Sequence, residues 1–413
     1  MTTKNENKEE NMQVIAPELV GMSAERLKNI GTKLQQYVDA ERAAGFVTLV
    51  ARDSEIVHFE ACGYRDAEQR LPMELDTIFR IYSMTKPITS IALMMLHEQG
   101  KFQLVEPVSR YIPAFGNTKV LAGYGYMGPQ LASQNPPMTI HHLLTHTAGL
   151  SYGFFFDSPI DEMYRDSIFR SETASLEEKI VGMAELPLRF QPGSAWNYSI
   201  ATDVCGYLVQ LLADMPFEDF LAERIFEPLG MVDTAFHVSA DKLDRFATLY
   251  RHDAQTGGFS EYEGAPHIPW HDYSKPASAP SGGGGLVSTM SDYWQFANML
   301  LNEGELYDTR IIGRKTLEFM TRNHISKELL PMAIGLATIS GRGFGLGFDV
   351  VMDAPQTGVI NSEGNYGWSG AAATNFWVDP QEQLVGIIMT QLMDNMLLFQ
   401  QDFRALTYQA LVD

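Results

Sequence analysis

The 413-residue sequence is short of cysteine, of positive charge and of long apolar runs. Its two cysteines, Cys62 and Cys205, lie far apart, which excludes zinc ribbons and redox Cys-x-x-Cys sites; we expect both to be small buried residues in the reduced state. Thirty Lys and Arg against 51 Asp and Glu give a net charge of -21, which argues against nucleic acid and membrane partners. The longest apolar run, from Ile88 to Leu96, is far below the roughly 20 residues needed to span a bilayer.

The first residues of the chain are polar and charged, with no apolar stretch of the kind found in secretory signals. We therefore expect a disordered tail over residues 1–15 and a cytoplasmic protein. Apolar residues make up 45% of the chain and charged residues 20%, which is typical of a globular protein with a sizeable core. The length predicts two or three domains, or one large core with an insertion.

Strand-like segments occur near both ends of the chain, and helix-like segments lie between them. Apolar residues from Leu27 to Val38, after the capping residue Ser23, predict a helix that ends near Gly45. Strands are predicted over 46–51 and 55–61, joined as a hairpin, and over 343–352, 371–378 and 384–391. Helices are predicted over 87–99, 139–144, 176–183, 202–213, 217–226, 291–302 and 395–411, the sixth opened by a Ser-Asp pair.

This order predicts an α+β fold, an α/β sandwich whose antiparallel sheet is built from N- and C-terminal segments and flanked by helices. We assign residues 16–82 and 277–413 to this α/β domain. Residues 83–276 are assigned to an inserted, mostly helical domain.

A serine and a lysine three residues apart, Ser83 and Lys86, open an apolar helix. At this spacing their side chains share one helix face. A serine becomes a good nucleophile only beside a group that takes its proton, and a buried lysine can do this. Free backbone amides at the helix start also stabilise negative charge on an acyl oxygen. The alternative is a capping serine with a solvated lysine, which is what we expect at the second such pair, Ser239 and Lys242.

Two further segments carry candidate site residues. Tyr198 follows a turn and comes directly before a helix that Ser199 can cap; its hydroxyl could pass a proton, or the ring could only anchor a loop. The segment from Tyr366 to Ala371 brings small residues to the start of a strand, where backbone amides can complete an oxyanion hole. The alternative there is an ordinary glycine-rich strand start with Trp368 in the core.

Taken together, these motifs resemble those of the serine hydrolases with the β-lactamase and penicillin-binding-protein fold, and most closely the class C-like family VIII carboxylesterases. The corresponding elements are Ser83 with Lys86, Tyr198 with Ser199, and Trp368-Ser369-Gly370. The segments 144–150 and 281–288 also resemble the family, so the likeness extends over nearly the whole chain. It implies a β-lactamase/transpeptidase-like fold with the active site at the interface of the two domains.

The resemblance also implies roles for individual residues. Ser83 would be the nucleophile, with Lys86 and Tyr198 sharing its proton, in an order that the sequence leaves open. The backbone amides of Ser83 and Ala371 would form the oxyanion hole. Substrate contacts are expected from four further positions, Tyr82, Trp368, Ser369 and Gly370.

Two positions depart from the β-lactamase pattern. Ile200 stands where β-lactamases have an asparagine, and Trp368 stands where they have the lysine of Lys-Thr-Gly. A cation for the substrate carboxylate is therefore missing, which favours an uncharged ester over a β-lactam.

The sequence thus predicts a serine carboxylesterase that hydrolyses short- to medium-chain esters of small molecules, with no metal and no cofactor. Acyl transfer to an alcohol, weak β-lactam hydrolysis and non-catalytic binding stay open as alternatives. The chain has no Gly-x-Ser-x-Gly nucleophile elbow, and His141, His142 and His146 lack a His-Glu-x-x-His pattern, so we expect capping roles for them. Aromatic residues at 124, 126, 152 and 154–156 are expected to shape the cleft, the core or an interface. The oligomeric state is not predicted.

Overall fold

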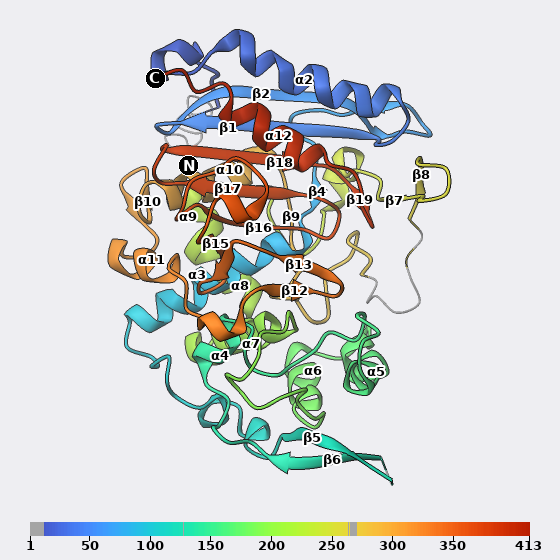
Figure 1. The fold of residues 1–413 in the computed structure, drawn as a ribbon, viewed down its shortest axis with the longest axis vertical. Helices are drawn as coiled ribbons and strands as arrows, with labels where there is room; N and C mark the ends of the chain where they lie inside the picture. Colours follow the sequence, from blue (N-terminus) through green and yellow to red (C-terminus); the bar gives the residue numbers. More distant parts are fainter. Residues whose placement is uncertain (1–11, 127, 263, 265–270) are drawn as a thin grey trace.

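An eight-stranded antiparallel sheet lies at the centre of the molecule, in the order β14-β15-β16-β17-β18-β1-β2-β3 (Figure 1). The computed structural model describes residues 12–126, 128–262, 264 and 271–413. Strand β1 (Gly45–Arg52) pairs with β2 (Glu55–Asp66) on one side and with β18 (Leu384–Met389) on the other. The two ends of the chain therefore build one sheet, which confirms the predicted α+β fold. The remaining strands of this sheet are β3 (Leu71–Pro72), β14 (Arg342–Phe344), β15 (Asp349–Val351), β16 (Tyr366–Ser369) and β17 (Asn375–Asp379).

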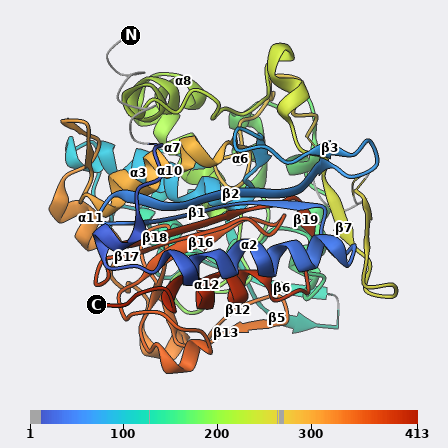
Figure 2. The same cartoon turned by 90° about the horizontal axis from the view of Figure 1, so that it is seen from above.

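Helices cover both faces of the sheet, as Figure 2 shows. Phe46 and Val50 of β1 face one side, where they pack with α2 (Ala24–Asp39) and α12 (Phe399–Tyr408). Val47 and Leu49 alternate with them and face the other side, in one core with α3 (Thr85–Glu98) and α10 (Met290–Leu301). This alternation is the two-residue period expected of a strand that is buried on both faces.

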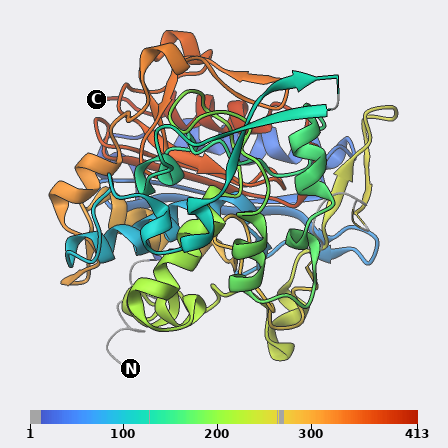
Figure 3. The same ribbon diagram turned by 90° about the horizontal axis from the view of Figure 1, so that it is seen from below.

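The chain between the two parts of the sheet is mostly helical and lies in front of the sheet in Figure 3. Its helices are α4 (Ile140–Leu144), α5 (Pro159–Arg165), α6 (Leu176–Met183), α7 (Ala201–Ala213), α8 (Phe217–Leu221) and α9 (Glu227–Leu229). Short strands join this region to the sheet or extend from it. Two pairs are β4 (Phe79–Arg80) with β9 (Val287–Ser288) and β5 (Lys119–Gly125) with β6 (Gly128–Ser133). A set of three consists of β7 (Tyr250–His252), β8 (Phe259–Glu261) and β19 (Leu392–Met393). Later in the chain lie α11 (Arg314–Met320), β10 (Glu305–Leu306) with β11 (Thr309–Arg310), and β12 (Met332–Ile334) with β13 (Ala337–Ile339).

Several predicted elements have different bounds in the structure. The strand predicted over 343–352 is a hairpin of β14 and β15, because Gly347 has a φ of 93° and the chain turns there. Residues 371–374 form a turn, so the strand predicted from 371 begins at Asn375. The cap of α10 is Thr289, whose side chain accepts a hydrogen bond from the Asp292 amide, and not the Ser-Asp pair. The β5–β6 hairpin was not predicted.

Part of the predicted tail, residues 1–11, lies outside the described residues. Beyond it, the Ile15 amide donates a hydrogen bond to the Ile56 carbonyl at 2.9 Å, which fixes the chain beside β2. The domain limits at 82/83 and 276/277 stay predictions. Across the described ranges, no helix is both long enough and apolar enough to cross a membrane. Cys205 is buried, Cys62 is half-buried, and both are free thiols.

Candidate active site

Ser83 lies in a tight turn between β4 and α3. A 3-10 turn over Tyr82–Met84 runs directly into α3, whose first residue is Thr85. Tyr82 has a φ of 42°, in the left-handed region that residues other than glycine seldom adopt. Such a conformation persists only where the surroundings hold it, and it often marks a functional position. Here it presents the half-buried Ser83 to a cleft.

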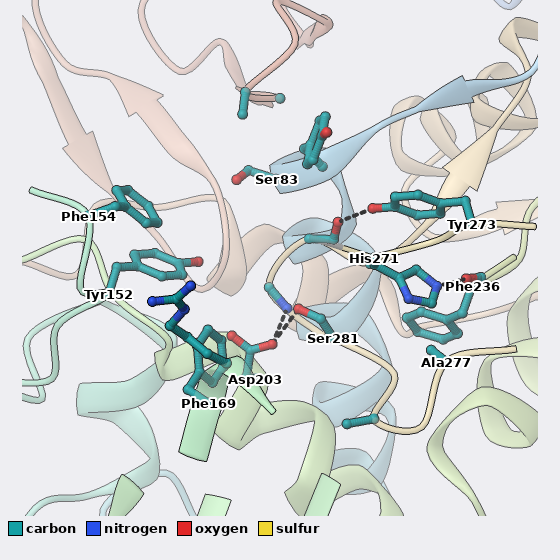
Figure 4. A pocket seen from close by; sticks show the side chains of 18 of the residues that line it. Ser83, Tyr152, Phe154, Phe169, Asp203, Phe236, His271, Tyr273, Ala277 and Ser281 are labelled. Atoms are coloured by element: carbon teal, nitrogen blue, oxygen red, sulfur yellow. Dashed lines mark hydrogen bonds between the residues drawn. The ribbon is translucent and has the colours of Figure 1, made fainter. Parts of the chain in front are cut away.

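The cleft has a volume of about 1060 Å³ and aromatic walls. Figure 4 shows Tyr152 and Phe154 on one side of it and Phe236, His271 and Tyr273 on the other. Of the predicted site residues, those that line it are Tyr82, Ser83, Tyr198, Ser369, Gly370 and Ala371. Charged side chains also line it, among them Arg170, Lys179, Asp203, Arg251, Asp272 and Lys275, so the cleft offers both apolar and polar groups to a small molecule.

Lys86 is buried directly behind the serine, with only 1% of its surface exposed. Its Nζ lies 3.1 Å from Ser83 Oγ, 2.8 Å from the Tyr152 hydroxyl and 2.7 Å from the Gly283 carbonyl oxygen. Ser83 and Lys86 are therefore in contact as predicted, although Ser83 lies in the 3-10 turn before α3 and not on the helix itself. A lysine can be buried in this way because its amino group has three hydrogen-bond partners.

Tyr152 belongs to the site in a way that the sequence did not predict. It was expected only as one of several aromatic residues near the cleft, but its hydroxyl contacts Lys86 and shares a hydrogen bond with Tyr198. Burial raises the pKa of the Tyr152 hydroxyl well above its usual value, and the nearby Tyr198 and Asp203 raise it further. Its ring stacks on Phe154, with 4.7 Å between the ring centroids.

Tyr198 lies against the same lysine. Lys86 Nζ is 4.4 Å from the centroid of the Tyr198 ring, and the Trp368 indole donates a hydrogen bond to the Tyr198 hydroxyl at 3.3 Å. The turn before Tyr198 is fixed by Asn197, whose side chain donates to the Leu150 carbonyl at 2.8 Å. Ser199 is not the helix cap that was predicted, because α7 begins at Ala201 after Ile200.

Asp203, in the first turn of α7, holds the glycine-rich loop that follows Ser281. Its Oδ1 accepts hydrogen bonds from Ser281 Oγ at 2.5 Å and from the Gly283 amide at 3.2 Å. Burial raises the pKa of this carboxyl group, against the opposing effects of Ser281 and Lys86. A Cβ at position 283 would lie 2.7 Å from Asp203 Oδ2, so any larger residue there would displace this carboxylate or the loop. Asp203 was not predicted as a site residue.

The edge of β16 forms another wall of the cleft. Ser369 and Ala371 are exposed there, and a Cβ at Gly370 would lie 2.5 Å from the Ile81 carbonyl oxygen. The small residues predicted at this edge therefore allow it to approach the turn that carries Ser83. Trp368 differs from its neighbours, because it is only 6% exposed and does not line the cleft.

The histidines of the sequence motif have structural contacts. His142 forms a capping box with Thr139 at the start of α4. His146 is buried, and both its burial and the nearby Lys86 lower the pKa of its ring well below the usual value. Within the described ranges, no three His, Cys, Asp or Glu side chains lie close enough together to hold a metal ion.

Comparisons with known proteins identify the family of this chain. The model of the family named Beta-lactamase matches residues 31–410. Protein Rv1367c of Mycobacterium tuberculosis is 34% identical to this chain over 87% of it and 88% of that protein, and esterase EstB of Burkholderia gladioli is 31% identical over 86% and 88%. The solved structure of EstCE1, a hydrolase with promiscuous acyltransferase activity, matches with a TM-score of 0.79 and 28% identity over 93% of this chain and 98% of its own. This chain belongs to the beta-lactamase family and is a serine hydrolase with that fold.

Proposed function

We propose that the protein is a serine carboxylesterase that hydrolyses short- to medium-chain carboxylic esters of small molecules through an acyl-enzyme on Ser83. The observation that carries the proposal is the 3.1 Å contact between Ser83 Oγ and the buried Lys86 Nζ at the wall of a mainly apolar cleft. The esterase relative EstB supports the same reaction class. We also propose that the protein is cytoplasmic and binds neither nucleic acid nor membranes, because its net charge of -21 would repel both.

The acylation step follows from the contacts of Lys86. As a neutral amine it has two N–H groups, which the Gly283 carbonyl and the Tyr152 hydroxyl accept, and its lone pair is left facing Ser83. Ser83 Oγ attacks the ester carbonyl carbon while its proton moves to Lys86 Nζ. The electron pair of the carbonyl bond moves to the oxygen, where the backbone amides of Ser83 and Ala371 stabilise the charge.

Collapse of this intermediate breaks the bond to the alcohol oxygen. The leaving alkoxide takes a proton from Tyr198, which Lys86 restores through the hydroxyl of Tyr152. Water then attacks the acyl-enzyme and gives its proton to the same network. The carboxylic acid is released and Ser83 is regenerated.

The tryptophan at position 368 favours an uncharged ester over a β-lactam. Trp368 stands where β-lactamases have a lysine and is buried, so this position offers no cation to a substrate carboxylate. Tyr82, Ser369 and Gly370, which all line the cleft, remain the proposed substrate contacts.

The test is the turnover of p-nitrophenyl butyrate by the wild-type protein and by Ser83→Ala. Ser239→Ala is the matched control, because Ser239 belongs to the second Ser-x-x-Lys pair, whose lysine Lys242 forms an ion pair with Asp233 at 2.8 Å. We expect turnover to be lost in Ser83→Ala and kept in Ser239→Ala. Equal turnover in all three proteins, or none in the wild type, would rule out the proposal and favour a non-catalytic binding protein.

Acyl transfer is a second candidate, because EstCE1 is described as having promiscuous acyltransferase activity. The same acyl-enzyme would then pass its acyl group to an alcohol in place of water. Adding a primary alcohol to the assay and measuring the ratio of new ester to free acid distinguishes the two reactions. A ratio no higher than that of the uncatalysed reaction would exclude transfer.

A further inference from the structure

Trp368 has a place in the structure that does not fit a substrate contact. It is 6% exposed, absent from the cleft lining, and packs against Tyr198 and Phe344 with ring centroids 5.5 and 5.3 Å away. Tyr198 itself does line the cleft, so its ring separates the indole from the cleft space. The polar atom of the indole, Nε1, donates to the Tyr198 hydroxyl at 3.3 Å.

The donor and the acceptor of this hydrogen bond are fixed by the chemistry of the two groups. An indole N–H can only donate, so the Tyr198 oxygen accepts this hydrogen bond. The same hydroxyl shares a hydrogen bond with Tyr152, and Lys86 Nζ lies 4.4 Å from the ring centroid. Two neighbours thus fix the orientation of the phenol, and a donor in a site shielded from water stabilises an anion more strongly than it does in water.

We propose that Trp368 is a positioning residue for Tyr198. Its N–H fixes the phenol group and stabilises the negative charge that forms when the Tyr198 O–H bond breaks and its proton goes to the leaving alkoxide. The indole keeps its own proton throughout. This inference rests on the proposed function, in which Tyr198 carries that proton.

The test removes the donor while keeping the ring. Trp368→Phe is one variant, and replacement of Trp368 by β-(3-benzothienyl)alanine is a second one, in which sulfur replaces N–H with almost no change of shape. Trp196→Phe is the matched control, because Trp196 also stacks on Tyr198, with centroids 6.3 Å apart, but its Nε1 has no hydrogen-bond partner among the described residues. We expect kcat for an alkyl ester such as ethyl butyrate, whose alkoxide must be protonated to leave, to fall on the order of ten- to hundredfold in both Trp368 variants. KM should stay within about threefold, and Trp196→Phe should keep kcat within about threefold of the wild type.

Two results would overturn the inference. Wild-type kcat in the benzothienyl protein would show that the N–H is not needed. A raised KM with unchanged kcat in Trp368→Phe would make Trp368 a wall of the substrate site.

Failure of the proposed function gives a different pattern. If the wild type hydrolyses no ester but a fluorophosphonate labels Ser83, the nucleophile is present, and the indole NMR measurement described next replaces kcat, because fluoride leaves without a proton from Tyr198. If Ser83 is not labelled either, the esterase proposal fails, and the indole NMR signal that Trp368→Phe removes decides on the contact. That signal should shift in Tyr198→Phe, and an unchanged signal would overturn the inference.

Discussion

A single methyl group at position 283 should disturb the surroundings of Lys86. In Gly283→Ala the new Cβ would lie 2.7 Å from Asp203 Oδ2 and 3.1 Å from the Tyr152 hydroxyl. Both neighbours hold the surroundings of Lys86: Tyr152 contacts its Nζ directly, and Asp203 fixes the amide of the residue whose carbonyl Lys86 contacts.

The size of the effect follows from these distances. To restore an ordinary contact of 3.4 Å, the carboxylate or the loop has to move by about 0.7 Å. Overpacking of this kind typically lowers the free energy of unfolding by about 1–3 kcal/mol. A catalytic group misplaced by about 1 Å costs on the order of a hundredfold in rate, so we expect kcat to fall roughly ten- to hundredfold.

The assay compares Gly283→Ala with Gly284→Ala, its neighbour in the same loop. At Gly284 the nearest atom to a new Cβ is the Tyr82 carbonyl carbon at 3.6 Å, an ordinary contact, so turnover should stay within about threefold of the wild type. Turnover of p-nitrophenyl butyrate and urea unfolding would be measured for both variants. A folded Gly283→Ala protein with wild-type kcat, or equal losses in both variants, would refute the reasoning.

Three further changes test buried titratable side chains. Lys86→Met keeps much of the side-chain volume but removes the proton acceptor, so turnover should fall by about a hundredfold or more while the far-UV circular dichroism spectrum is unchanged; near-normal turnover would contradict a role as base. Burial lowers the pKa of His58 to about 4 from 6.5. As pH falls, the unfolded chain therefore binds the proton before the folded one does, and the free energy of unfolding should fall by roughly 3 kcal/mol for this ring between about pH 6.5 and 4. Urea titrations across this range would measure the decrease. In His58→Gln that decrease should be smaller, and an equal decrease would contradict the assignment. Burial raises the pKa of Asp203, so ionisation of this carboxyl group lowers the free energy of unfolding as pH rises from the ordinary aspartate pKa of about 4. Asp203→Asn keeps the Oδ1 acceptor and should therefore gain stability relative to the wild type as pH rises in urea titrations. A gap that narrows as pH rises would contradict this.

Local patterns predicted the elements whose bounds depend on neighbouring residues alone. The helix over 176–183 has the predicted bounds, and Ser23 caps α2 as expected. Both predictions depend only on the spacing of apolar residues and on a capping residue that lie next to each other in the chain. The strand over 343–352 was predicted as one, because apolar residues continue through the turn at Gly347. The hairpin of β5 and β6 was missed, since its glycines and proline interrupt the alternation of apolar and polar residues that indicates a strand.

The site was predictable to the extent that its residues are close in the chain. Ser83 and Lys86 are one helical turn apart, so the spacing alone placed them together. Tyr152 lies 66 positions from Lys86, and nothing in its own neighbourhood indicates a contact with a buried amine. Asp203 stands in an apolar helix, where an acid whose partners come from residues 281–283 looks the same as a solvated one.

The remaining partner of Lys86 could not have been named from side chains at all. Its closest acceptor is the backbone carbonyl of residue 283, 197 positions away, and every residue type has such a carbonyl. What restricts the position is the space around it, because Asp203 and Tyr152 leave no room for a Cβ. The only trace of this third hydrogen-bond partner of Lys86 in the sequence is therefore a glycine. It stands in a glycine-rich segment that composition alone would identify as a loop. A glycine required by close approach, and not by a positive φ, marks where the backbone itself is part of the site.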